Sequence, residues 1–388
     1  MTNFSSFIAN RIDQVPVSGI RRFFGLTEKM PDVISLGIGE PDFGTPKPIT
    51  EAGFKAVHGQ SIGYTANSGL PELREAIAEH LEKLYGVSYN PKDEIIVTVG
   101  VSEGMKCVMS ALCNEGDEII VPQPCFVAYT PEVIFANGKP VEVECKAENN
   151  FEITADEIRE AITPRTKAIF LGFPNNPTGA VLSRKNALEI AKLAEEKNLL
   201  IISDEIYDRL VYGVDHVCMS ALPDMKERTI LLGGFSKDYA MTGWRVGYVC
   251  GNKELIAAIG KIHQYCVMSA PTISQFAAIA ALKIGEPFVQ EMRTEYDRRR
   301  KFVVSAFNET GLDCFEPKGA FYAFPSIKKT GLSSDEFCDK LLEQQQVAVI
   351  PGNAFGLGGE GHIRVAYCKS YEQLEIACER IRNFVNQL

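Results

Sequence analysis

The chain has 388 residues, of which 45% are hydrophobic and 23% are charged, and its formal net charge is −10. This is the ordinary mixture of a globular protein that is long enough to bury a core without metals or disulfides. The acidic balance argues against a nucleic-acid partner, because that role needs a basic surface over a whole domain.

Short apolar runs alternate with helical patterns between residues 94 and 250. The apolar runs are continuous and rich in leucine and β-branched residues, which indicates strands buried on both faces. Helices are predicted over 102–113, over 154–162 with a capping box from Thr154 to Glu157, and over 186–198. The alternation predicts an α/β fold, with a mainly parallel sheet covered by helices on both faces. The predicted strands are EIIVTVG (94–100), EIIVP (118–122), PVEVEC (140–145), KAIFLGF (167–173), LLIISDE (199–205), TILLGGF (229–235) and WRVGYVCG (244–251).

The pattern changes after about residue 290, where a long helix over 287–310 leads away from the sheet. The basic run at 298–301 falls inside this helix and is interpreted as a solvated helix face. Short strands and two more helices follow, which indicates a smaller α+β domain. We expect a large domain over 46–290 and a small domain made of 1–45 with 291–388. The late strands are predicted around 320–327, 347–352 and 362–368, and the late helices over 333–345 and 370–387.

The eleven cysteines are scattered and form no C-x-x-C pair, so the sequence indicates no metal site and no dithiol redox motif. The first residues, MTNFSSFIANRIDQ, lack the apolar core of a signal peptide. No apolar run reaches the roughly eighteen residues that a membrane span needs. These features predict reduced thiols, a cytoplasmic location and no membrane partner.

Polar residues follow successive predicted strands, at the edge where open parallel sheets bind ligands. Each has an ordinary structural explanation when taken alone: a helix cap, a turn or a solvated charge. Their arrival at one edge instead favours a site for an anion, a cationic ring and a hydroxyl. They are Ser102, the turn PNNPTG (174–179), Asp204 with Tyr207, and Ser236 with Lys237.

A set of motifs runs through nearly the whole chain in a fixed order. They are LGIGEPDF (36–43), YTANSGLPELR (64–74), PNNPTG, SDEIY (203–207), SKDYAMTGWRVGY (236–248) and HIRVAYC (362–368). With these motifs the chain resembles the class I aminotransferases of the aspartate/aromatic branch, which are pyridoxal-phosphate enzymes of fold type I. The resemblance implies a sheet of the seven-stranded type in the large domain. It also implies transfer of the amino group of an L-amino acid to a 2-oxo acid, with 2-oxoglutarate as the expected acceptor, by a ping-pong mechanism.

The same resemblance assigns catalytic roles around pyridoxal 5'-phosphate. Lys237 is expected to form a Schiff base with the cofactor aldehyde and to move protons. Asp204 is expected to keep the pyridine nitrogen protonated. Tyr207 and Asn176 are expected to hydrogen-bond the phenolic oxygen of the ring.

Binding roles follow in the same way. Arg245, on the predicted strand WRVGYVCG, and the helix start at Val101 and Ser102 are expected to hold the phosphate. Ser236 adds a hydroxyl, and Phe126 stacks on the ring. Arg364 is expected to bind the substrate carboxylate, assisted by Asn176 and the backbone at Gly39. Tyr64 is expected to reach the cofactor of the partner subunit in a homodimer.

Several alternatives remain open at this point. The same scaffold carries N-acetyl-diaminopimelate-type aminotransferases and cysteine-conjugate β-lyases, and a non-enzymatic relative would be a cofactor-binding sensor. Ser102 stands where some aspartate-using relatives place a lysine, which argues against strict aspartate specificity. The N-terminal segment, including SGIRRF (18–23), is expected to close over the substrate. GLGGEG (356–361) matches a dinucleotide fingerprint, but it precedes a predicted strand, so we interpret it as a loop.

Overall fold

The computed structural model of the protein describes residues 4–16, 30, 32–59 and 62–388. The segment SGIRRF (18–23) therefore lies outside the described residues. None of the described helices combines the length and the apolar character that crossing a bilayer requires. Seven strands form the central sheet of the described chain, namely β2 (Ile95–Thr98), β3 (Glu118–Gln123), β4 (Lys139–Glu144), β5 (Thr166–Gly172), β6 (Leu200–Asp204), β7 (Thr229–Gly234) and β8 (Gly247–Cys250).

The strand order in this sheet is β2-β8-β7-β6-β5-β3-β4. The run from β7 to β4 is parallel throughout, whereas β8 is antiparallel to both of its neighbours, β7 and β2. The mainly parallel sheet that the sequence predicted is therefore confirmed.

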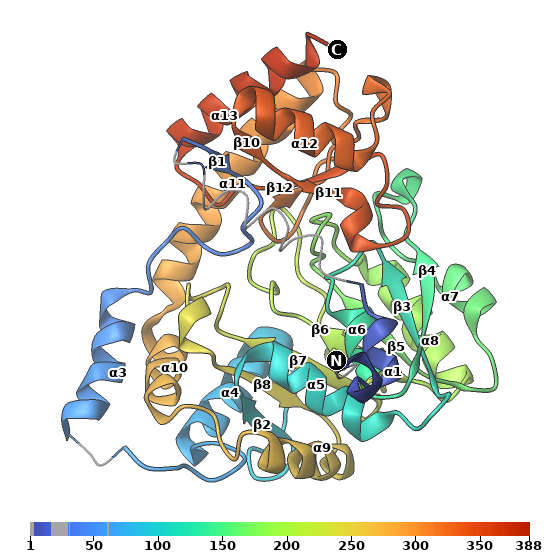
Figure 1. Ribbon diagram of the computed structural model, residues 1–388. Helices are drawn as coiled ribbons and strands as arrows, with labels where there is room; N and C mark the ends of the chain where they lie inside the picture. The colour runs from blue at the N-terminus through green and yellow to red at the C-terminus, as the bar shows by residue number, and fades with distance from the viewer. Residues whose placement is uncertain (1–3, 17–29, 31, 60–61) are drawn as a thin grey trace.

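Helices cover both faces of the sheet (Figure 1). Along β7, the side chains of Ile230 and Leu232 pack into one apolar cluster, and that of Leu231 packs into another on the opposite face. This alternation explains why the strand is an unbroken apolar run. The cluster that contains Ile230 and Leu232 also includes side chains of α5 (Gly100–Leu112), α6 (Tyr129–Phe135) and α9 (Lys253–Cys266). The opposite face of the sheet is covered by α4 (Pro71–Tyr85), α7 (Ala155–Ala161), α8 (Arg184–Glu196) and α10 (Thr272–Ile284). Helix α3 (Lys47–Gly59) packs against α10. The predicted capping box of α7 is present, with Thr154 and Glu157 bonded reciprocally.

The long helix α11 (Glu286–Glu309) leads to a second set of elements at the top of Figure 1. The predicted strand at 347–352 divides into β10 (Val347–Ala348) and β11 (Ile350–Pro351), which join different sheets. Near the N-terminus, β1 (Ile34–Ser35) pairs with β10. A three-stranded antiparallel sheet is formed by β11, β12 (Ile363–Ala366) and β9 (Tyr322–Ala323), and the late helices are α12 (Ser334–Gln345) and α13 (Tyr371–Val385). The division into domains over 46–290 and over 1–45 with 291–388 stays a prediction.

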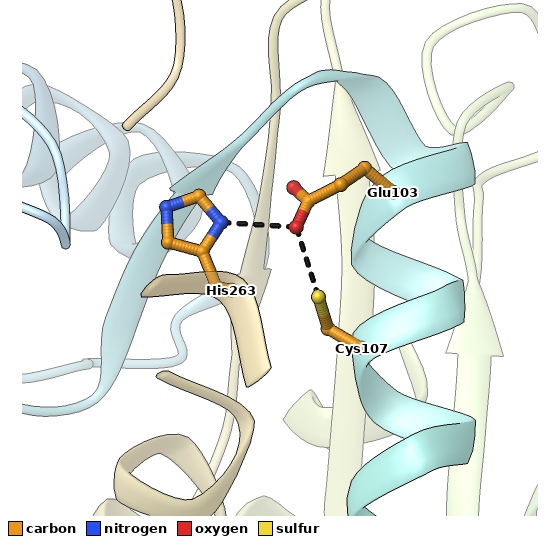
Figure 2. A group of neighbouring side chains, drawn as sticks. All are labelled: Glu103, Cys107 and His263. Carbon is orange, nitrogen blue, oxygen red and sulfur yellow. Dashed lines mark hydrogen bonds and ion pairs between the residues drawn. The ribbon is translucent and has the colours of Figure 1, made fainter. Parts of the chain in front are cut away.

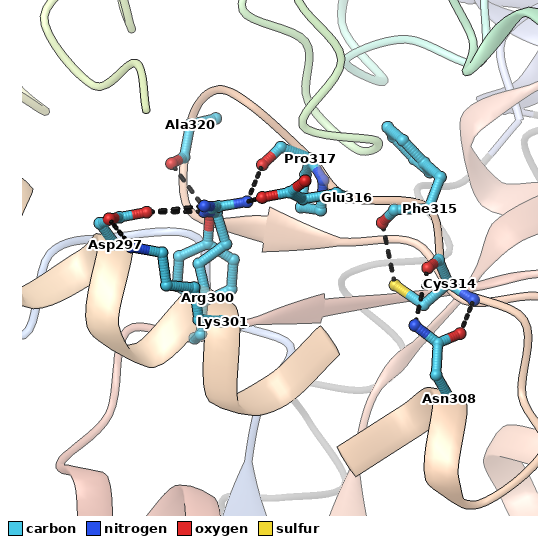
Figure 3. A network of polar contacts seen from close by, with 10 residues as sticks. Asp297, Arg300, Lys301, Asn308, Cys314, Phe315, Glu316, Pro317 and Ala320 are labelled. Carbon is cyan, nitrogen blue, oxygen red and sulfur yellow. Dashed lines mark hydrogen bonds and ion pairs between the residues drawn. The ribbon is translucent and has the colours of Figure 1, made fainter. Parts of the chain in front are cut away.

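The prediction of a solvated basic face at 298–301 is wrong for the two central arginines. Arg299 and Arg300 are buried, at 6% and 3% exposed. The guanidinium of Arg300 pairs with Asp297 and Glu316 and donates to the Pro317 carbonyl, as Figure 3 shows. The guanidinium of Arg299 pairs with Glu295 and with Asp42, which is 257 positions away. These acidic partners make burial of the two charges tolerable.

A second correction concerns the segment before β8. The sequence placed Arg245 on a strand, but it follows a short 3-10 helix over Thr242–Trp244 and has a φ of 52°. The strand begins two residues later, at Gly247. The GLGGEG segment forms turns that lead into β12, as a loop should.

Candidate active site

A cavity of about 520 Å³ lies at the carboxyl-terminal edge of the central sheet, where β2, β5, β6 and β7 end. Its lining contains every predicted site residue except Tyr64, whose side chain is 84% exposed and lies outside the cavity. The predicted residues that line it are Gly39, Val101, Ser102, Phe126, Asn176, Asp204, Tyr207, Ser236, Lys237, Arg245 and Arg364.

Lys237 comes three residues after the end of β7 and lines this cavity. Its Nζ donates a hydrogen bond to the Gly39 carbonyl at 2.7 Å and lies 5.8 Å and 5.6 Å from the ring centres of Tyr207 and Phe321. Burial lowers the pKa of this amine to about 8. A neutral amine is the nucleophilic form, so Lys237 is far better prepared to attack a carbonyl carbon than an exposed lysine.

Asp204 is the last residue of β6, and its buried side chain lines the cavity. Its carboxylate accepts hydrogen bonds from the Tyr129 hydroxyl at 2.8 Å and from the Ile206 backbone N–H at 3.2 Å. Burial raises the pKa of this carboxyl to about 6. None of the side chains that the structure describes forms an ion pair with it, so the site favours a ligand that brings its own positive charge.

Arg364 lies on β12, and its guanidinium is buried against the rings of Tyr322 and Phe355 at 4.7 Å and 4.8 Å. It donates to Asn176 Oδ1 at 2.9 Å and to the Gly37 carbonyl at 2.6 Å, and its Nε has no partner within the part of the chain that the structure describes. Burial lowers the pKa of this guanidinium. No described carboxylate contacts it. A buried cation without an anion is strongly unfavourable, so this one is suited to binding a ligand carboxylate.

Arg245 lines the cavity too, and its guanidinium lies beside Gly100, the first residue of α5. A Cβ built on Gly100 would lie 2.9 Å from the Arg245 guanidinium, and Gly100 has a φ of +74°, so both the contact and the backbone require glycine there. The helix start presents free backbone N–H groups and the positive end of the helix dipole. No described carboxylate pairs with Arg245. Together these groups form a cradle suited to an anion such as a phosphate.

Tyr129 and Tyr322 line the cavity as well, and the sequence analysis missed both. Tyr129 holds Asp204, and the hydroxyl of Tyr322 lies 2.9 Å from that of Tyr207. Burial raises the pKa of Tyr207 well above its ordinary value, which keeps it a neutral phenol that can donate a hydrogen bond. The only sequence signal for Tyr129 was its position just after Phe126 in the segment PCFVAY.

The family model described as aminotransferase class I and II matches residues 31–381. The chain belongs to this family. It is 46% identical to an aspartate aminotransferase of Pyrococcus abyssi and 43% identical to aromatic-amino-acid aminotransferase 2 of Thermococcus litoralis, in each case over 98% of both chains. The solved structure of an aromatic aminotransferase from Pyrococcus horikoshii aligns with a TM-score of 0.90 at 45% identity, covering 94% of this chain and 99% of that one.

This aminotransferase is an enzyme of the pyridoxal-phosphate-dependent fold type I class and acts on amino acids. The residues of the cavity fit the cofactor. An unpaired buried carboxylate at Asp204 suits a cationic ring nitrogen, the Arg245 cradle suits a phosphate, and the amine of Lys237 suits an aldehyde. The individual roles of these residues remain predictions.

The lowered pKa of Lys237 gives the cofactor-free aminotransferase a measurable property. Raising the pH through about 8 converts the ammonium to the amine, so the rate at which the enzyme bonds pyridoxal phosphate should rise with a midpoint near that value. Initial rates of absorbance change against pH measure this. Free Nα-acetyl-lysine is the control. A midpoint at the ordinary lysine value of 10.5 would show that burial does not act on Lys237.

Proposed function

We propose that this aminotransferase moves the amino group of aspartate and of aromatic L-amino acids to 2-oxoglutarate by a ping-pong mechanism. The observation that carries the proposal is Arg364, a buried guanidinium that has no acidic partner among the described residues and lies in the same cavity as the low-pKa amine of Lys237. Every substrate of this class brings the carboxylate that Arg364 lacks. The names of the two relatives at 46% and 43% identity support the choice of substrates.

The proposed division of work follows from the contacts. Arg364, positioned by Asn176 and the Gly37 carbonyl, binds the α-carboxylate and thereby turns the substrate Cα toward Lys237. When bound, pyridoxal phosphate supplies an electron sink for the bonds at Cα. The neutral amine of Lys237 removes the α-proton and later returns it. Asp204, which is buried and accepts a hydrogen bond from Tyr129, stabilises positive charge on a bound ring.

The cavity lining offers few charges to the substrate side chain. Among the described residues of the lining, the cations are Lys237, Arg245 and Arg364, and each has a proposed role already. The carboxylates of the lining are Glu40 and Asp204, and Ser102 and apolar residues, including Ile38 and Phe126, lie among them. This supports acceptance of aromatic side chains alongside the shorter acidic one, rather than strict aspartate specificity.

The experiment that tests the proposal is a visible absorption spectrum of the cofactor-loaded enzyme with a panel of donors. Aspartate, tyrosine and phenylalanine should bleach the cofactor band, and 2-oxoglutarate should restore it. Release of pyruvate and ammonia from a cysteine conjugate, or bleaching by N-acetyl-diaminopimelate alone, would replace the proposal with one of the two related activities. A band unchanged by every donor would contradict it.

Arg364→Lys tests the carboxylate receptor. Lysine keeps the charge but loses the paired donors, and a hydrogen bond to a charged group contributes roughly 1.5–3 kcal/mol. We expect KM for both the amino acid and the 2-oxo acid to rise roughly 10- to 100-fold, with a smaller change in kcat. Steady-state kinetics with each substrate varied in turn measure this. An unchanged KM for both substrates would remove Arg364 from the site.

We further propose that the enzyme is a cytoplasmic homodimer in which Tyr64 reaches the cofactor of the partner subunit. The exposure of the Tyr64 side chain supports the second part, and the eleven free cysteines support a reducing compartment. Light scattering that returns the mass of a single chain would contradict the dimer. Separate large and small sheets, joined through α11, support the proposed division into two domains.

A further inference from the structure

A cluster of three potential metal ligands lies between α5 and α9, away from the cavity lining. Glu103 and Cys107 are four residues apart, on one face of α5, and His263 reaches them from α9, as Figure 2 shows. Glu103 Oε1 lies 2.8 Å from Cys107 Sγ and 3.0 Å from His263 Nδ1. One ligand atom of each residue lies within 4.8 Å of the other two. Cys107 and His263 are buried, and the Glu103 side chain is 12% exposed.

Backbone groups orient two of these ligands. His263 Nε2 lies 2.8 Å from the Asn67 carbonyl, which can only accept, so Nε2 carries the hydrogen and Nδ1 faces the cluster. The second oxygen of Glu103 accepts a hydrogen bond from the Val99 backbone N–H at 3.0 Å. A histidine that donates its other ring N–H to a backbone carbonyl is the arrangement usually seen around metal-binding imidazoles.

A fourth ligand is close at hand. Cys266 ends α9, three residues after His263, and its side chain is exposed. Residues three apart on a helix lie on the same face, so Cys266 is on the face of α9 that carries His263. The chain thus provides E-x-x-x-C on one helix and H-x-x-C on its neighbour.

We propose that Glu103, Cys107 and His263 bind a Zn²⁺ ion, with the Cys266 thiolate as the fourth ligand. Two thiolates, an imidazole and a carboxylate form a donor set that zinc prefers and that magnesium and calcium do not. Tetrahedral bonds of about 2.0–2.3 Å set the donor atoms about 3.5 Å apart, between the observed 2.8 Å contact and the 4.8 Å limit of the cluster. Binding requires that both thiols give up their protons to solvent, together with the proton of the hydrogen bond between His263 Nδ1 and Glu103 Oε1, and no group is oxidised or reduced.

The place of the site in the fold gives the ion a role in positioning. It would join α5, whose first turn faces the cavity, to α9, and through His263 to the backbone at Asn67, three residues after Tyr64. None of the four ligands lines the cavity. The ion therefore stabilises the position of the first turn of α5 in the active site, and it does not contact the reacting groups.

Titration of the cofactor-loaded enzyme with Co²⁺ tests the site. We expect one equivalent of Co²⁺ to bind and to absorb strongly at red wavelengths, as tetrahedral cobalt with thiolate ligands does. The cofactor does not absorb at those wavelengths. Added Zn²⁺ should abolish the absorption, and binding should release protons to a weak buffer. Cys107→Ser and His263→Gln should lose the absorption. Cys113→Ser, at the other end of α5, is the matched control and should keep it.

A second variant keeps the test decisive if a buried substitution unfolds the chain. Cys266→Ser changes an exposed residue, and it should weaken Co²⁺ binding at least tenfold while transamination stays within about twofold of the wild type. Zn²⁺ should raise the melting temperature of the wild type but not that of Cys107→Ser. The proposal is overturned if Co²⁺ shows no tetrahedral spectrum or if the spectrum survives Cys107→Ser. It is also overturned if Cys107 and Cys266 form a disulfide and the reduced protein still binds no metal.

Discussion

Replacement of Lys237 by alanine should abolish transamination while leaving the fold intact. The variant loses the amine that we propose bonds the cofactor aldehyde and acts as the base that removes and returns the α-proton. General base catalysis alone contributes up to about 10⁴-fold, and loss of the covalent function adds to this, so we expect kcat to fall by at least about 10⁴-fold. Steady-state turnover with aspartate or tyrosine and 2-oxoglutarate measures the effect.

The matched control is Lys192→Ala, which removes a lysine of 77% side-chain exposure on α8, far from the cavity lining. It should keep full activity. The melting temperature of the Lys237→Ala variant should stay near that of the wild type, because a buried amine with a lowered pKa adds no stability to the folded chain. Steady turnover by Lys237→Ala would refute the proposed mechanism.

Asp204→Asn should produce the second-largest loss. The substitution keeps the size of the side chain but removes the only negative charge proposed to face the ring nitrogen. Removing one preorganised electrostatic contact typically lowers kcat about 10²- to 10³-fold, and we expect a loss in this range together with weaker cofactor binding. Turnover at saturating cofactor and a fluorescence titration with pyridoxal phosphate separate the two effects.

Tyr129→Phe is the control for this second prediction. It removes the 2.8 Å hydrogen bond to Asp204 but leaves the carboxylate in place. A single hydrogen bond contributes about 0.5–1.5 kcal/mol, so we expect at most about a tenfold loss of kcat. If Tyr129→Phe were as damaging as Asp204→Asn, the charge of Asp204 would not be the cause.

The sequence predicted the central sheet and the residues that gather at its edge because both follow from one rule. Buried parallel strands are continuous apolar runs, and their carboxyl ends meet, so Asp204 and Lys237 had to arrive together. Arg299 and Asp42 were not predictable in the same way, since a pair separated by 257 positions leaves no local pattern. The sequence analysis missed Tyr129 and Tyr322 because a tyrosine at either position could be explained equally well by packing in the apolar core.

Two predicted strands differ from the structure for different physical reasons. The segment at 347–352 is a single apolar run, but its two halves pair with β1 and β12, whose directions the run does not encode. Arg245 was assigned to a strand because Val246 and the residues after it favour one. The left-handed turn that begins the strand instead at Gly247 depends on close packing against Gly100, which is far away in the sequence.

The zinc hypothesis shows a limit of the sequence rules. Those rules recognise pairs of cysteine or histidine ligands at the short spacings found in zinc fingers, and the sequence has no C-x-x-C pair. Here each helix contributes a mixed pair, and only the packing of α5 against α9 brings the pairs together. Neither half of the cluster is distinctive by itself.

The reversed direction of β8 has a consequence for how the proposed cofactor contacts are spaced along the chain. Because β8 runs opposite to β7, its amino-terminal end lies at the edge where the other strands finish, and Arg245 lies there only eight positions after Lys237. In a parallel β8 the same arginine would lie at the far edge of the sheet, roughly 13 Å away across four residues. The connection over 235–246 therefore carries both cations, so an insertion or deletion between them would move the proposed aldehyde anchor and the proposed phosphate cradle relative to each other.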